Sequence, residues 1–382
     1  MSAIRSVFVL NTGSSSVKYR VLDPVSGEVA ASGLIDRIGE PESGTLDHRA
    51  AIARILDALS GVSIDAVGHR IVHGGDRYID ATVIDEEVER GIEALAPLAP
   101  LHNPAGLLGI RAARAALPEL PQVAVFDTAF HATMPAAARS YALDADLASE
   151  HGIRRYGFHG TSYRIVSERT AEFLGRPLNE LRMIVLHLGN GASAAAIDAG
   201  RSIDTSMGMT PLEGLVMGTR SGDLDPAVLL YLQRNAGFGV DELDELLNRR
   251  SGLLGLSGHS DMRAVTAAAA AGDAAAGLAM DVYLHRLRHY IGAYTAELGG
   301  LDALVFTAGV GENSPAVRAG AVAGLEVLGI ELDAAANAHS EATARRISPP
   351  SARVAVLVVP TDEELQIARE TASVLDRQNA RQ

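Results

Sequence analysis

Lys18 is the only lysine among the 33 basic residues of the chain, and it closes a loop of small polar residues. From Asn11 to Lys18 this loop reads Asn-Thr-Gly-Ser-Ser-Ser-Val-Lys. Glycine lets a backbone approach a ligand, successive N–H groups can form an anion-binding nest, and an ammonium group is a compact point charge. The loop therefore favours phosphate binding, with a chance surviving lysine on a strand surface as the alternative.

Two further glycine-rich loops follow apolar runs. Gly189-Asn190-Gly191 comes after Met183–Leu188, and the sequence Gly-Val-Gly-Glu-Asn at 309–313 comes after Leu304–Phe306. The loops at Gly13 and Gly189 do not match the Walker A pattern, which disfavours a P-loop fold. One such loop is usually a simple turn, but three in one chain favour nucleotide binding.

Arginine and histidine side chains stand beside glycines in three places. Arg70 lies in Gly-His-Arg-Ile-Val-His-Gly-Gly, Arg220 in Met-Gly-Thr-Arg-Ser-Gly-Asp, and His159 in Tyr-Gly-Phe-His-Gly-Thr-Ser. A guanidinium with room around it can bind a carboxylate or phosphate through two parallel hydrogen bonds. Taken singly, each arginine is more often part of a structural ion pair, and a lone histidine is more often structural.

Carboxylates follow two more of the apolar runs. Asp127 comes after Val123–Phe126, and Asp362 and Glu363 come after Val354–Val359. Strand ends are common catalytic positions in open α/β sheets, and oxygen ligands suit magnesium bound mainly through water and phosphates. Asp362 and Glu363 could equally cap a helix that follows them.

Short apolar runs and helical stretches alternate along the chain, which predicts an α/β architecture. The expected strands are Val7–Leu10, Ala66–Val72, Val123–Phe126, Met183–Leu188, Leu304–Phe306 and Val354–Val359. The expected helices are Ala50–Leu59, Val88–Leu95, Ala105–Leu117 and Ala264–Leu298, the last broken near Gly272.

A weak internal repeat relates Ser6–Asp23 to Arg182–Asp198, since each reads as strand, small polar turn and strand. The spacing is close to half the chain. This suggests two similar halves, each with one hairpin loop, although two unrelated glycine-rich turns explain the pattern about equally well. We place the boundary near residue 150.

The composition excludes several classes of function. A net charge of −14 argues against nucleic acid or an acidic membrane surface as a partner, and an aromatic content of 4% argues against a base-stacking platform. Cysteine is absent, which removes disulfides and thiolate metal sites. No apolar run approaches the roughly 20 residues of a membrane span, and Val7–Leu10 is too short for a signal peptide, so we expect a cytoplasmic protein.

Taken together, these motifs resemble the acetate kinase family within the acetate and sugar kinase/Hsp70/actin superfamily. The resemblance runs nearly end to end. It rests on 11–18, 68–75, Pro-Leu-His-Asn-Pro at 100–104, 125–131, 155–162, 187–191, 204–214, 217–226, Ser-Asp-Met-Arg at 260–263, 309–313 and 360–364. The chain departs from the family pattern in a shorter segment around 39–48, in Thr12, where alanine is usual, and in a contracted turn at 258–260.

The resemblance implies two duplicated ribonuclease H-like (actin-like ATPase) domains with an active site in the cleft between them. These domains are 1–150 and 151–364, with a C-terminal helix over 365–382 packing back on the first. It also implies a homodimer and a reversible transfer between ATP and acetate that gives acetyl phosphate and ADP. Magnesium is the expected metal, with manganese as an alternative.

The resemblance also assigns residues. Asp127, His159 and Arg220 look catalytic, and Asn11 and Glu363 look like metal ligands. The acetate site looks like Arg70, Val72, Leu101, Phe158 and Pro211. The ATP contacts look like Lys18, Ser14, Ser16, His187, Leu188, Gly189, Asn190, Gly191, Asp261, Met262, Arg263, Gly309, Val310, Gly311, Glu312 and Asn313.

Three rival functions stay open at this point. A kinase for propionate or another short-chain acid is the nearest, because one methylene is worth only about 1–3 kcal/mol in an apolar pocket. A non-catalytic nucleotide switch of the actin/Hsp70 type is the second. A phosphoryl-handling hydrolase of the same fold is the third.

Overall fold

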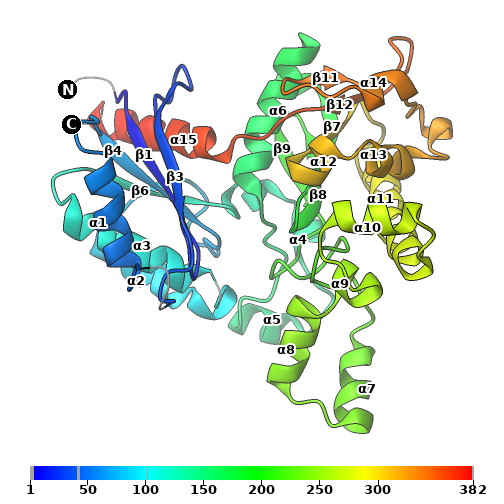
Figure 1. Cartoon of the computed structure of the whole chain (residues 1–382), viewed down its shortest axis with the longest axis horizontal. Coiled ribbons are helices and arrows are strands. Elements are labelled where there is room, and N and C mark those ends of the chain that lie inside the picture. Colours follow the sequence, from blue (N-terminus) through cyan, green and yellow to red (C-terminus); the bar gives the residue numbers. More distant parts are fainter. Residues whose placement is uncertain (1–3, 41–43, 101, 381–382) are drawn as a thin grey trace. The chain divides into compact units, whose positions relative to one another are not determined.

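The computed structural model describes residues 4–40, 44–100 and 102–380, which form two compact units (Figure 1). The first unit contains Met1–Ala132, Gly160–Ser162 and Asp362–Gln382. The second contains Thr133–His159 and Tyr163–Thr361. Among the described residues, no helix is long and apolar enough to cross a membrane.

The first unit is built on a six-stranded sheet in the order β3-β2-β1-β4-β6-β5. Its strands are β1 (Val7–Thr12), β2 (Val17–Leu22), β3 (Val29–Ile35), β4 (Ala66–Ile71), β5 (Thr82–Val83) and β6 (Gln122–Phe126). β1, β4 and β6 run parallel, and the other pairings are antiparallel. The parallel strands are almost wholly buried, as their continuous apolar runs predict.

Helices cover the faces of this sheet. They are α1 (His48–Ala58), α2 (Glu86–Ala94), α3 (Asn103–Ala116) and α15 (Glu363–Asn379), with the one-turn helices η1 (Ala96–Leu98) and η2 (Ala129–Thr133). Asp47, Asp85 and Asp362 each accept a backbone hydrogen bond at a helix N-terminus. α15 packs on β1, β4 and β6, although it lies at the other end of the sequence.

The second unit repeats the same sheet topology, with the strand order β9-β8-β7-β10-β12-β11. The strands are β7 (Arg182–Leu188), β8 (Ala192–Asp198), β9 (Arg201–Thr205), β10 (Ala303–Thr307), β11 (Arg345–Arg346) and β12 (Ala355–Val358). Each pairing has the same direction as its counterpart in the first unit. The duplication predicted from the two hairpins is thus confirmed.

The remaining helices belong mainly to the second unit. They are α4 (Ala136–Arg139), α5 (Ala145–Glu150), α6 (Gly160–Leu174), η3 (Leu178–Glu180), α7 (Ala227–Ala236), α8 (Val240–Arg249), α9 (Gly252–Ser257), α10 (Met262–Ala270), α11 (Ala274–Glu297), α12 (Ala308–Asn313), α13 (Pro315–Val322), η4 (Glu326–Leu328) and α14 (Ala334–Ala338). The predicted break near Gly272 separates α10 from α11.

One predicted loop is wrong. Residues 308–313 form the short helix α12 directly after β10, where the glycine-rich sequence indicated an open loop. The buried guanidinium of Arg318 donates to the carbonyls of Gly311 and Glu312, at 2.9 Å each. These bonds satisfy carbonyls at the end of the helix that local sequence could not cap, which explains why a helix forms there.

Candidate active site

In the first unit, the β1–β2 hairpin presents the loop that sequence predicted for phosphate binding. The Gly13 N–H donates to the Ser16 carbonyl at 2.8 Å, and Ser14 and Ser15 are exposed at the tip. His48, at the start of α1, hydrogen-bonds the Gly13 carbonyl at 2.8 Å through Nε2. The loop is therefore ordered by the protein, with its serines directed to solvent.

Lys18 has a partner that its sequence context did not indicate. Its ammonium lies 2.5 Å from Oε1 of Glu364, whose side chain is 9% exposed, while the Lys18 side chain is 52% exposed. Burial opposes the charged carboxylate, but the bond from Lys18 holds the pKa of Glu364 below its ordinary value. Half of the lysine remains open to solvent and can meet a ligand.

Arg70 and Asp127 form a bidentate ion pair at the ends of β4 and β6. Nε donates to Oδ1 at 3.0 Å and Nη2 donates to Oδ2 at 2.7 Å. Asp127 is 1% exposed, so burial raises the pKa of its carboxyl group while Arg70 counteracts the rise. Arg70 also directs Nη1 toward Oδ1 of Asn11, 3.5 Å away.

Glu363 lies next to this pair, and one oxygen of its carboxylate can bind a further group. Its Oε1 is buried and has no hydrogen-bond partner among the residues that the structure describes. The Glu363 carboxylate acts on both Arg70 and Asp127, raising the pKa of each. An orphaned carboxylate oxygen with the amide oxygen of Asn11 in the same unit suits a hard cation that keeps most of its ligands as water and phosphate.

In the second unit, the β7–β8 hairpin is the counterpart of β1–β2. His187 and Ser193 occupy the register positions that Asn11 and Lys18 occupy in the first hairpin, one pair before the last. The His187 ring stacks on that of His159, with centroids 4.1 Å apart and planes 16° from parallel. Sequence reasoning missed Ser193, although the internal repeat could have indicated it.

Two cationic or donor groups converge over the tip of this hairpin. A Cβ placed on Gly191 would lie 3.6 Å from Nη1 of Arg220 and 3.7 Å from Nε2 of His159. His159 has a φ of 58°, a strained left-handed conformation for a residue other than glycine. Such strain is typical of functional positions, where the surrounding structure enforces it.

Arg220 lacks a counter-ion among the described residues. Its Nη1 donates to the Pro211 carbonyl at 3.0 Å and lies 3.6 Å from the Met217 sulfur, and no carboxylate is within ion-pair distance. Burial alone lowers the pKa of Arg220 below its ordinary value. A partly buried cation without an anion is costly, and a bound anion would relieve that cost.

The loop that carries Arg220 is fixed by Asp223. Oδ1 accepts from the Gly214 N–H at 2.9 Å, and Oδ2 accepts from the Tyr290 hydroxyl at 2.9 Å. Arg286, on the same face of α11, lies 3.4 Å from Oδ2. The loop is therefore tied to the long helix α11, which is buried along one face, and this holds Arg220 in place.

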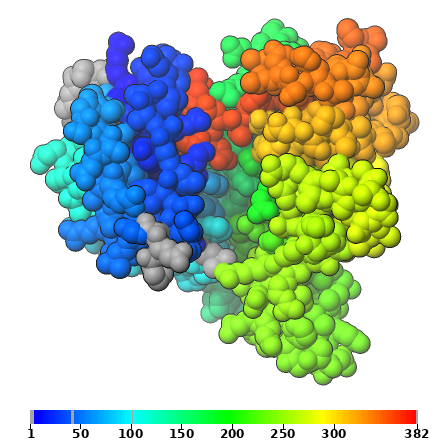
Figure 2. All heavy atoms as spheres, viewed as in Figure 1, coloured from blue at the N-terminus to red at the C-terminus, as the bar shows by residue number. Residues whose placement is uncertain are grey.

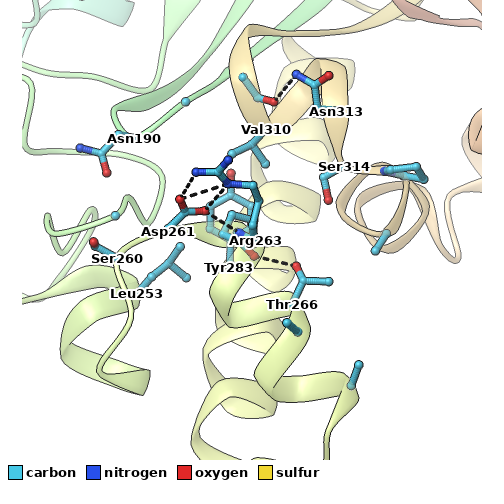
Figure 3. Close-up of a pocket in the computed structure, with 18 residues that line it drawn as sticks. Asn190, Leu253, Ser260, Asp261, Arg263, Thr266, Tyr283, Val310, Asn313 and Ser314 are labelled. Atoms are coloured by element: carbon cyan, nitrogen blue, oxygen red, sulfur yellow. Dashed lines mark hydrogen bonds and ion pairs between the residues drawn. The ribbon is translucent and has the colours of Figure 1, made fainter. Parts of the chain in front are cut away.

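A pocket of about 900 Å³ lies in the second unit next to this hairpin (Figure 3). Its size falls in the range of small-molecule sites. The lining residues come from the β7–β8 tip, the loop between β9 and α7, α9 to α13 and the turns between those helices: Gly189, Asn190, Gly218, Leu253, Ser260, Asp261, Met262, Arg263, Thr266, Ala267, Ala270, Tyr283, Gly309, Val310, Asn313, Ser314, Pro315 and Ala316. Two of these lining residues, Asp261 and Arg263, form an exposed ion pair 2.5 Å apart.

Glu312 is turned away from this pocket. Its Oε1 accepts from the N–H groups of Ala308 at 2.9 Å and Thr361 at 3.2 Å. Ala308 has a φ of 64°, so Glu312 stabilises a strained turn between β10 and α12. Glu312 therefore holds the segment in place, and the ATP contact that the family resemblance implies for it stays a prediction.

The other predicted residues are distributed between the two units. Leu188 is fully buried and, like His187, Gly191 and Gly311, is not among the pocket-lining residues. Val72 is half-buried in the first unit, whereas Phe158, 1% exposed, and half-buried Pro211 belong to the second. Leu101 lies outside the described residues. The apolar pocket for the substrate methyl group stays a prediction.

Comparison with known proteins gives consistent results. The model of the acetokinase family matches residues 6–369. A relative named acetate kinase from Leifsonia xyli is 62% identical over 387 residues, covering 96% of this chain and 98% of the relative.

Two solved structures agree in fold over nearly the whole chain. The acetate kinase of Porphyromonas gingivalis has a TM-score of 0.92 at 45% identity, with 97% of this chain and 100% of that chain covered. A propionate kinase from Francisella tularensis has a TM-score of 0.91 at 42% identity, with 97% and 99% covered. The chain belongs to the acetokinase family.

Proposed function

We propose that this protein is an acetate kinase, which reversibly transfers a phosphoryl group from ATP to acetate and yields acetyl phosphate and ADP. Support comes from the relative of that name at 62% identity and from the Porphyromonas gingivalis structure. Family membership implies ATP as a co-substrate and a divalent metal ion.

The donor groups of Arg220 and His159 at the tip of the β7–β8 hairpin give the strongest support to this proposal. Arg220 Nη1 and His159 Nε2 face the same point at Gly191, and the neighbouring Gly189 and Asn190 line the large pocket. A nucleotide whose base and ribose occupy the pocket would direct its phosphates toward the hairpin tip. The negative charge of a transferring phosphoryl group would then meet a guanidinium that lacks an anionic partner.

The acceptor needs little activation. A carboxylate is already a nucleophile at neutral pH, so catalysis depends on in-line positioning and on charge neutralisation. Arg70 is the candidate that binds the acetate carboxylate. Because Asp127 already occupies Nε and Nη2, the group best placed for the substrate is Nη1, which points to Asn11. Asp127 would hold the guanidinium in the orientation that this contact requires.

Magnesium is the metal we propose, with manganese as an alternative. Asn11 and Glu363 would hold it, and the orphaned Oε1 of Glu363 is the observation that fits. Among the described residues no three His, Asp or Glu side chains converge as a metal cage, so water and phosphate oxygens would complete the coordination. The ion would neutralise charge on the phosphates.

A second candidate function is the phosphorylation of propionate. The Francisella tularensis structure of that name supports it at 42% identity, below the identity to the acetate kinase relative. Val72, Phe158 and Pro211 are the side chains that would decide between the acids. We expect kcat/KM to fall from acetate to propionate to butyrate, and a higher value for propionate would favour the alternative.

The homodimer is also a proposal. α7 has no buried residue, and Val228, Leu230 and Tyr231 are 41%, 49% and 64% exposed. Figure 2 shows the segment of α7 and α8, in yellow-green, projecting from the second unit. Light scattering should give twice the chain mass, and Tyr231→Glu should lower it. The cytoplasmic location stays a prediction.

An assay with hydroxylamine tests the activity itself. Hydroxylamine converts an acyl phosphate to a hydroxamate, so the protein with ATP, magnesium and acetate should give acetyl hydroxamate. No product would support a nucleotide switch, and phosphate release that does not depend on acetate would support a hydrolase. Asp127→Asn should lower the yield, whereas substitution of the exposed Asp241 should leave it unchanged.

A further inference from the structure

The guanidinium of Arg155 holds the turn that follows β9. Its Nη1 donates to three successive carbonyls, those of Thr205 at 2.9 Å, Ser206 at 3.1 Å and Met207 at 3.1 Å. Carbonyl dipoles that converge on one point repel each other, and a cation at that point reverses the repulsion. Arg155 therefore fixes the start of the loop that leads to Arg220.

Glu213 binds the same guanidinium from further along this loop. Its Oε1 lies 2.5 Å from Nη2 of Arg155, and its Oε2 accepts from the hydroxyl of Tyr141. The Tyr141 hydroxyl in turn accepts from the N–H of Met209 at 3.1 Å. Asp204 is 3.9 Å from Nε of Arg155, too far for a hydrogen bond, so Glu213 is the carboxylate that closes the loop.

Gly208 lets Glu213 and Tyr141 meet inside the loop. A Cβ on Gly208 would overlap both Oε2 of Glu213 and the Tyr141 hydroxyl. The carbonyl of Gly208 accepts from the N–H groups of residues 156 and 157, at 3.0 Å and 3.2 Å. The same loop is thus bonded to the segment that ends at His159.

Both donor groups of the candidate site depend on this loop. The carbonyl of Pro211, between Met209 and Glu213, accepts from Nη1 of Arg220 at 3.0 Å. His159 follows the segment that is bonded to Gly208. Because Nη1 of Arg220 and Nε2 of His159 converge at the tip of the β7–β8 hairpin, a shift of the loop would change the distance between them.

We propose that Arg155, Glu213 and Tyr141 are positioning residues that set the placement of Arg220 relative to His159. None of the three is among the described residues that line the pocket, so their effect passes through the loop. The effect on kcat rests on the proposed function, whereas the order of the loop does not.

Hydrogen exchange measured by mass spectrometry tests the order of the loop. Glu213→Ala should speed exchange of the backbone N–H groups over 206–223 by about tenfold, the effect expected from losing a hydrogen bond to a charged group. Tyr141→Phe keeps the ion pair and should speed exchange less, and it replaces Glu213→Ala if that variant does not fold. Unchanged exchange over 206–223 would overturn the proposal, whether or not the protein phosphorylates acetate.

Asp302→Ala is the matched control. Asp302 pairs with Arg176 at 3.0 Å and Arg182 at 3.5 Å in the same unit, and its side chain is 19% exposed. Its removal also breaks an arginine–carboxylate contact, but one that does not involve the loop. Asp302→Ala should therefore lower the free energy of unfolding and leave exchange over 206–223 unchanged.

Kinetics test the positioning role. Glu213→Ala should lower kcat by roughly 10–100-fold, because a misplacement of about 1 Å can cost about 100-fold, with KM for ATP changed less than about twofold. Arg155→Lys keeps the charge but not the planar fork that binds carbonyls and Glu213 together, so it should lower kcat as well. Asp302→Ala should keep kcat near normal. An equal loss of kcat in this control, a change confined to KM, or normal kcat despite faster exchange in Glu213→Ala would contradict the role.

Discussion

The guanidinium of Arg220 is the side chain on which the chemistry of the second unit depends most. It donates to a carbonyl and contacts a sulfur, but no carboxylate among the described residues neutralises it. A structural arginine would normally be paired when it is this buried. The unpaired charge and the proximity to His159 support a role in binding developing negative charge.

We expect Arg220→Ala to lower kcat by at least about a thousandfold, since a cation on the transferring phosphoryl group is worth about 10³–10⁵ in rate. Steady-state kinetics with a circular dichroism check of folding measure the effect. Arg249→Ala, an exposed arginine in the same unit, serves as the control. A loss of less than tenfold in a folded Arg220→Ala protein would remove Arg220 from the mechanism.

The ammonium group of Lys18 is expected to contact the phosphates of ATP. Lys18→Arg should raise KM for ATP by about tenfold, or ~1.4 kcal/mol, because a planar guanidinium cannot replace a compact ammonium at a phosphate. Arg20→Lys on the same strand, whose arginine pairs with Asp362 at 2.9 Å, is the matched control and should leave KM unchanged. Unaltered ATP kinetics in Lys18→Arg would make Lys18 a partner of Glu364 only.

Local turns at the site were predictable from the sequence, whereas contacts between residues far apart in the chain were not. Gly, Ser and Asn at strand ends carry a local signal, so the hairpin loops were predictable from the chain alone. The roles of Glu312 and Ser193 were not, because they depend on partners 49 and 34 residues away in the sequence. The Arg70–Asp127 pair spans 57 residues and was equally hidden. Such contacts are set by tertiary packing.

Among the elements, α15 shows how strongly packing depends on one glycine. A Cβ on Gly68 of β4 would lie 2.6 Å from Oγ1 of Thr371 and 2.9 Å from Cγ2 of Ile367, both on α15. The helix can approach the strand this closely only because that Cβ is absent. α15 carries Glu363 and Glu364 at its first turn, so the approach also places the candidate metal ligand.

Gly68→Ala should therefore destabilise the protein by about 1–3 kcal/mol through overpacking, measured by urea unfolding. Gly277→Ala and Gly292→Ala on α11 are controls, since a Cβ there meets nothing within 4 Å. They should be neutral or stabilising by up to about 1 kcal/mol, because alanine favours helix. If all three variants behaved alike, the close packing of α15 on β4 would be refuted.

The central strands and the helices α1, α2, α3, α10 and α11 were predicted, since continuous apolar runs and helical spacing indicate them. The strands β3 and β9 and the helix α6 were not predicted. α12 was not predicted either, because its helical state depends on bonds from Arg318 and Thr361, which lie outside its own glycine-rich sequence. Glycine lowers helix propensity, and only tertiary bonds reverse that preference here. Short elements of this kind lie beyond local sequence analysis.

For the molecule as a whole, the duplicated topology explains why each unit has a hairpin with a glycine-rich turn and a polar side chain at the same register position. The same strand order and directions appear in both sheets, so Lys18 and Ser193 are equivalent by position. In the first unit this position carries a cation for phosphate. In the second it carries a hydroxyl that binds a catalytic histidine candidate. The two hairpins thus share one backbone arrangement but carry different side chains for different roles.

Stability should depend on pH through His69. Burial lowers the pKa of His69 to about 4, against 6.5 in an unfolded chain, and Nε2 pairs with Oε1 of Gln122 at 2.8 Å. The unfolded state therefore takes up a proton at a higher pH than the folded state. Stability is lost as the pH falls from 6.5 toward 4, by up to about 3 kcal/mol.

Denaturant titrations at several pH values measure this dependence, and His69→Gln should flatten it over the same range. His69→Gln also changes the bond to Gln122, so its absolute free energy of unfolding differs for a second reason. The quantity to compare is therefore the slope of the unfolding free energy with pH. An unchanged slope would mean that His69 does not remain neutral in the folded protein.

The central claim is that the phosphoryl group passes from ATP to the carboxylate of acetate. Phosphorus-31 NMR of the protein with ATP, magnesium and acetate follows this transfer without any trapping reagent. The account predicts that the acetyl phosphate resonance grows at the rate at which ADP appears, and that both cease when acetate is omitted. Growth of inorganic phosphate at the same rate with or without acetate, and no acetyl phosphate, would contradict it.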